Sequence, residues 1–164
     1  MGRVPVKSID NPWCQARLKA AKFNDRFSSR AGAAEYIGMH EDAIRNTELG
    51  LEKCMPVDKA VLLADAYNAP ELKNLYCREY CPIGQTLPLS DCVRNIEGIA
   101  VKLLVSLQSE KLAELKKSVL LIAADGRVTK NEVEDLQEVI AYFDDLSKTV
   151  SELKILTEKT KNEF

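Results

Sequence analysis

The chain has 164 residues, of which 46% are hydrophobic and 29% are charged, and its formal net charge is −2. This composition is typical of a globular protein rather than a disordered one, and no run of about 20 apolar residues predicts a membrane span. The first residues contain no apolar segment of the kind found in secretory signals, so we expect a cytoplasmic protein without a membrane partner.

Charge is distributed unevenly along the chain. Residues 1–30 contain seven Lys or Arg against two acids, a balance of +5, whereas residues 85–164 contain eleven against fourteen, a balance of −3. A basic leading segment followed by an acidic remainder is typical of a polyanion-binding domain joined to a solvated body. Chance clustering of basic residues on a helix surface is the alternative.

The first half of the chain is predicted to contain five helices. Pro12 suits a first helical turn, Ser28 and Ser29 are good N-cap residues, and Gly38 and Gly50 are good terminators. No segment alternates with period two, so the predicted fold class is all-α. The predicted helices span residues 12–27, 30–37, 41–49, 57–67 and 71–80.

Two of these helices have apolar residues spaced by three and four, which predicts their inward faces. The predicted inward residues are Ala16, Ala20, Phe23 and Phe27 on the first helix, and Val57, Val61, Ala64 and Tyr67 on the fourth.

Two prolines and a glycine within residues 81–88 predict a domain boundary. We therefore expect a domain at 10–82, a linker at 83–90 and a second domain at 91–164. The second domain has apolar stripes at helical spacing on either side of a predicted turn at Asp125–Thr129, and Thr129 with Glu132 predicts a capping box. This pattern predicts an antiparallel helical hairpin that could form a bundle or pair with a second copy. The stripes are Val93, Ile96, Ala100, Leu103 and Leu107, then Val139, Phe143, Leu146, Val150 and Leu153.

Residues 28–50 have the spacing of two short helices that cross steeply. Ala34 is small where the axes would meet, Gly38 permits a positive φ in the turn, and Ile44 could anchor the second helix from beneath. The run resembles the helix-turn-helix of the xenobiotic-response-element family, the lambda-repressor-like (Cro/cI-type) DNA-binding domains. The resemblance covers about half of the chain and rests on Ser29, Arg30, Ala34, Ile37-Gly38, Met39, Ile44 and Glu48-Leu49-Gly50.

The resemblance implies a sequence-specific transcription regulator with a five-helix domain that binds double-stranded DNA, and it assigns roles to single residues. Ser29 would cap its helix and present a backbone N–H to a phosphate, and Arg30 would reach a phosphate or a base. Glu48 would hold the turn in place. The face toward the major groove would carry Glu41, Asp42, Arg45 and Asn46, of which Arg45 could pair with guanine and Asn46 with adenine.

Glu41 and Asp42 depart from the family pattern, in which Ser, Thr or Gln are common. The two carboxylates suit a helix N-terminus, but they repel phosphates and weaken non-specific DNA affinity. An antitoxin or adaptor that keeps the repressor-like fold and binds protein instead of DNA is therefore an alternative.

The remaining chemistry is sparse. Cys77 and Cys81 are four apart, and with Cys14 they could form a thiolate cluster for zinc or iron–sulfur, but buried cysteines acting as small hydrophobes are the favoured interpretation. His40 is the single histidine, and no base or orienting group for cysteine–histidine catalysis is indicated. We expect neither an enzyme nor a cofactor.

Overall fold

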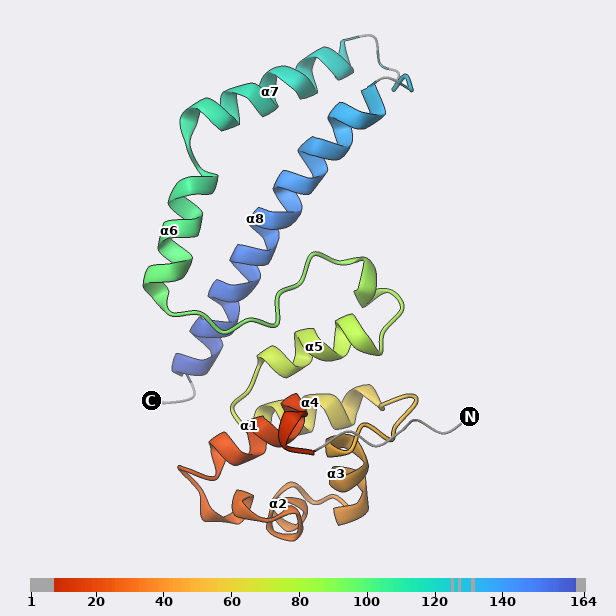
Figure 1. The fold of residues 1–164 in the computed structure, drawn as a ribbon, viewed down its shortest axis with the longest axis vertical. Coiled ribbons are helices and arrows are strands. Elements are labelled where there is room, and N and C mark those ends of the chain that lie inside the picture. The colour runs from red at the N-terminus through yellow and green to blue at the C-terminus, as the bar shows by residue number, and fades with distance from the viewer. Residues whose placement is uncertain (1–7, 125, 127, 131, 162–164) are drawn as a thin grey trace. The chain divides into compact units, whose positions relative to one another are not determined.

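The computed structural model describes residues 8–124, 126, 128–130 and 132–161, and within these ranges it is all-helical, without a strand (Figure 1). The chain divides into two compact units. The first lies within Met1–Leu87 and Glu158–Phe164, and the second within Pro88–Thr157. Among the described residues, no helix has the length and apolar character needed to cross a membrane.

The first unit is built from five α-helices and short 3-10 turns. Its buried core includes Trp13, Phe27, Ile44, Leu63 and Leu72, so every long segment of the unit contributes a side chain. The helices are α1 (Pro12–Ala20), α2 (Arg30–Ile37), α3 (Glu41–Glu48), α4 (Val57–Ala66) and α5 (Glu71–Glu79).

The first helix ends earlier than predicted. It ends at Ala20 and is followed by a separate 3-10 turn at Asp25–Ser28. Asn24 caps that turn because its side chain accepts a hydrogen bond from the N–H of Arg26 at 3.1 Å, a local bond that competes with continued helix. Phe23 is consequently 92% exposed, so the prediction that it faces inward is wrong.

The inward face of α4 is also rotated from its prediction. Val57 and Val61 are exposed, whereas Ala60 and Leu63 are buried together with the correctly predicted Ala64 and Tyr67. The run Val61-Leu-Leu-Ala has apolar residues on adjacent faces, so its spacing fits two orientations, and packing against the rest of the core selects one of them.

The two short helices of residues 28–50 lie where the sequence predicts them. Gly38 follows α2 with φ +77°, and its N–H donates to the carbonyl of Ala34 at 2.9 Å. Gly50 follows α3 with φ +65°. Both positions require the left-handed conformation that glycine adopts without a steric penalty.

The second unit contains α6 (Ile96–Ser106), α7 (Ser109–Ala123) and α8 (Glu132–Lys161), although the last residues of α8 belong to the first unit. The predicted two-helix hairpin is therefore wrong, because its first arm is two helices that meet at an angle (Figure 1). Gln108, between them, is extended with ψ 131°. Neither proline nor glycine marks this break in the sequence.

The predicted stripe on the first arm of the second unit is largely exposed. Val93, Ile96 and Leu107 are each about half exposed, and the buried side chain of α6 is Ile99. Before α8, the carboxylate of Glu132 accepts from the N–H and the hydroxyl of Thr129 at 2.8 and 2.7 Å, as expected of the glutamate in a capping box. The predicted turn at 125–129 includes residues 125 and 127, which lie outside the described residues.

Candidate nucleic-acid interface

Ser29 begins α2 as predicted. Its hydroxyl oxygen accepts a hydrogen bond from the N–H of Gly32 at 3.0 Å, and its backbone is extended, as expected of an N-cap. Ser29 is exposed, so the start of α2 is open to solvent. The exposed first turn of a helix carries partial positive charge and suits a phosphate oxygen.

Gly32 lies against the 3-10 turn that precedes α2. A Cβ atom at this position would stand 2.3 Å from the carbonyl oxygen of Arg26 and 3.1 Å from the hydroxyl of Ser29. We expect Gly32→Ala to destabilise the first unit by about 1–3 kcal/mol, since a backbone atom must move to relieve the clash. Urea unfolding followed by the fluorescence of Trp13, the single tryptophan, measures this. Ala31→Gly at the exposed neighbouring position is the control for helix propensity, and a neutral Gly32→Ala would contradict the packing described here.

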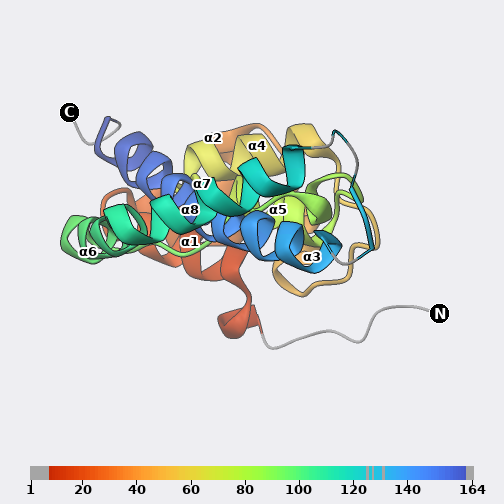
Figure 2. The same ribbon diagram turned by 90° about the horizontal axis from the view of Figure 1, so that it is seen from above.

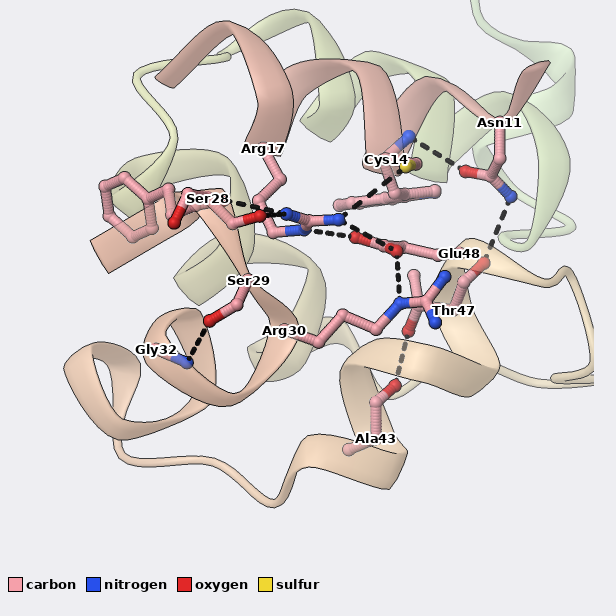
Figure 3. Close-up of polar contacts among 12 residues, drawn as sticks. Asn11, Cys14, Arg17, Ser28, Ser29, Arg30, Gly32, Ala43, Thr47 and Glu48 are labelled. Carbon is pink, nitrogen blue, oxygen red and sulfur yellow. Dashed lines mark hydrogen bonds and ion pairs between the residues drawn. The ribbon is translucent and has the colours of Figure 1, made fainter. Parts of the chain in front are cut away.

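A buried carboxylate joins the three helices that form the site. Glu48, at the end of α3, is 1% exposed, and its Oε1 accepts from Nε of Arg17 on α1 at 2.6 Å. Its Oε2 accepts from Nε of Arg30 on α2 at 2.6 Å and from Nη2 of Arg17 at 3.3 Å. Figure 3 shows the carboxylate between the two guanidinium groups. The two arginines therefore fix the end of α3 against both preceding helices.

Arg17 also ties α1 to the chain before α2. It is 5% exposed, and its Nη1 donates to the carbonyls of Phe27 and Ser28 at 2.7 and 3.2 Å. One guanidinium thus satisfies two backbone carbonyls and a carboxylate, which is the fixed, forked geometry that arginine provides and lysine does not.

The charge state of Glu48 follows from this environment. Burial alone would raise the pKa of Glu48, but hydrogen bonds and charge from Arg17 and Arg30 outweigh burial, and the pKa is lowered from its ordinary value. Cys14 lies beside the cluster, with its Sγ 3.8 Å from Nη2 of Arg17. Burial and the negative charge of Glu48 raise the pKa of this thiol, so it stays protonated near neutral pH.

The outward face of α3 carries the four predicted groove residues. Glu41, Asp42 and Arg45 are exposed and Asn46 is half-buried. Nη1 of Arg45 lies 3.8 Å from a carboxylate oxygen of Asp42, one turn earlier on the same helix. This exposed pair is weak, so the guanidinium can leave it for another acceptor. Three charged groups and an amide on one helix face can form hydrogen bonds of both polarities.

Arg30 has a different setting from the one predicted. Its side chain is 28% exposed, and its Nε is held by Glu48. Arg30 therefore contributes to the placement of α3, and substituting it would disturb the fold as well as any ligand contact.

A second polar cluster, which the sequence analysis missed, holds the loop after α3. Lys59 on α4 is 6% exposed, and its Nζ donates to the carbonyl of Ala43 at 2.7 Å and to the carboxylate of Glu52. Thr47 donates to the same carbonyl at 2.9 Å and to Glu52 at 3.2 Å. A lysine within an apolar helical stretch is the signal that could have indicated this cluster.

His40 caps α3, because its Nδ1 accepts from the N–H of Asp42 at 3.3 Å. The cysteines do not form the thiolate cluster considered from the sequence. Cys14 lies by Glu48, Cys77 belongs to α5 and Cys81 follows it, and no group of three or more metal-ligating side chains occurs among the described residues. Cys81 instead accepts from the N–H of Gly84 at 3.4 Å.

The chain was compared with known proteins at three levels. No protein-family model, no curated protein and no solved structure matches it. The functional argument therefore rests on the residues of this chain and their geometry.

Proposed function

We propose that the protein is a sequence-specific, DNA-binding transcription regulator of the cytoplasm. In this proposal α2, the turn at Gly38 and α3 act as a lambda-repressor-like helix-turn-helix, with α3 in the major groove. The observation that carries the proposal is the exposed face of α3, presented by a helix that the Arg17–Glu48–Arg30 network fixes in place. The exposed, capped start of α2 supports it by offering a phosphate contact.

The proposal gives each exposed residue one task. Arg45 would donate to guanine and Asn46 would pair with adenine, while Glu41 or Asp42 would accept from the amino group of cytosine. A homodimer joined by the C-terminal helices would place two recognition helices about 34 Å apart, on successive turns of one duplex face.

A protein-interaction module is the second candidate, and the charges on α3 favour it. Glu41 and Asp42 are both exposed, Arg45 lies beside Asp42, and Arg30 is held by Glu48. Few positive charges therefore remain to contact phosphates on this face. A basic partner protein would complement such a surface.

Arg45→Ala combined with Asn46→Ala separates the two candidates. We expect the double variant to lose about 10- to 100-fold in affinity for its preferred duplex, because each base contact is worth ~1–3 kcal/mol. Fluorescence anisotropy at low salt measures the loss. Lys111→Ala, an exposed lysine on α7, is the charge-matched control and should bind as the wild type does. Unchanged duplex affinity in the double variant would favour the interaction module.

A further inference from the structure

The second unit buries few apolar side chains for its length. Among its described residues, the buried apolar side chains are Ile99, Leu115, Ile122, Val139 and Ile155. Its three helices pack little against one another. Ordering a chain of this length costs about 1–2 kcal/mol of backbone entropy per residue, and so small a core offsets little of that cost. The unit therefore needs a partner to cover apolar surface.

The exposed apolar surface on α8 forms one stripe, which we call the outer stripe: Val133, Leu136, Ile140, Phe143 and Val150. Ile140 and Phe143 are 52% and 47% exposed. The spacing of three and four, with Ser147 at the remaining step, is the heptad spacing of a coiled-coil seam. The stripe differs from the buried Val139 and Thr149, which lie on other faces of the same helix. Figures 1 and 2 show α8 as one long helix without a break.

The charges of α8 are polarised along its length. From Glu132 to Ser147 the helix has six acids and no Lys or Arg, and from Lys148 to Lys161 it has four lysines and two acids. Glu132 and Asp144 border the outer stripe in the acidic half, and Lys148 and Lys154 border it in the basic half. A parallel pair of such helices would place like charges side by side, whereas an antiparallel pair would place the acidic half of each against the basic half of the other.

We propose that the outer stripe of α8 pairs with the same stripe of a second copy in an antiparallel arrangement. This inference deepens the dimer of the proposed function and rests on that part of it, but it does not depend on DNA binding. The occupant is a second copy because reversal of this helix supplies both an apolar seam and the complementary charges.

The first test is the mass of the full chain in solution. Sedimentation at micromolar concentration should give twice the 18.3 kDa chain mass for the wild type, and the monomer mass for Ile140→Asp combined with Phe143→Asp. Leu104→Asp, on α6 and 73% exposed, is the matched control and should remain dimeric. A monomeric wild type, or a double variant that stays dimeric, would overturn the proposal.

The second test uses the wild-type protein and reports the orientation. A carbodiimide joins carboxylates to amines in direct contact, and mixing ¹⁴N- and ¹⁵N-labelled copies identifies links between chains. We expect links from Glu132 or Asp144 of one copy to Lys148 or Lys154 of the other. A covalent dimer without such links would overturn the antiparallel pairing. Duplex affinity measured on the same samples reports separately on DNA binding, so the two proposals can fail independently.

Discussion

Glu48→Gln is expected to destabilise the first unit by about 3–5 kcal/mol, the range found when one partner of a buried ion pair is removed. The amide cannot compensate the guanidinium of Arg17, which is 5% exposed, or accept all the hydrogen bonds that the carboxylate accepts. Urea unfolding followed by Trp13 fluorescence measures the change within this unit. Glu41→Gln, an exposed glutamate of α3, is the control and should change stability by less than ~1 kcal/mol.

The same carboxylate predicts part of the acid sensitivity of the protein. Because the pKa of Glu48 is lowered in the folded state, its contribution to stability is complete above the ordinary value of 4.5 and is lost as the pH falls below 4.5 toward the folded-state pKa. The Glu48→Gln variant should therefore show a shallower loss of stability in that pH range than the wild type. Parallel acid curves for the two proteins would contradict the ionised pair.

Ile44→Ala is expected to cost about 2–5 kcal/mol, the range for truncating a buried aliphatic side chain to alanine. Ile44 is 1% exposed and belongs to the core beneath α3, so its truncation leaves a cavity under the proposed recognition helix. The midpoint of urea unfolding, again from Trp13, measures the effect. Duplex affinity should also fall, because a loosened α3 no longer presents Arg45 and Asn46 in one geometry.

Val57→Ala is the control for this prediction. Val57 is 61% exposed on α4, although its spacing predicted an inward position, so its truncation should change stability by no more than ~0.5 kcal/mol. If Val57→Ala cost as much as Ile44→Ala, the face of α4 assigned here would be wrong.

The features that the sequence predicts well depend on local chemistry. The start of α2 follows from a hydroxyl cap at Ser29, and its end follows from a glycine that can take positive φ at Gly38. The start of α3 depends on His40, whose ring nitrogen accepts the cap hydrogen bond that a hydroxyl more often provides. Each of these interactions spans a few residues, so single residue types indicate them.

The features that sequence spacing missed depend on contacts between distant residues. Arg17 and Glu48 are 31 positions apart, and nothing near Arg17 distinguishes it from the surface arginines of the basic leading segment. Its burial becomes visible when α1 packs across α2 and α3. Arg30, expected to contact DNA, contributes its Nε to the same cluster.

The break between α6 and α7 was missed for a related reason. Leu107-Gln108 contains no helix-breaking residue, and the apolar spacing continues across it. Such a stripe predicts which residues avoid water, but it does not say whether the cover comes from the same chain or from another copy.

Sequencing the DNA that the protein retains tests the central claim most directly. Fragmented genomic DNA of the source organism is incubated at low salt with the wild type or with the Arg45→Ala, Asn46→Ala variant, and the bound fragments are sequenced. A transcription regulator of the proposed kind predicts a small set of enriched fragments that share one sequence motif, with the enrichment lost in the variant. Retention without a shared motif, or the same fragments retained by both proteins, would contradict base recognition by α3.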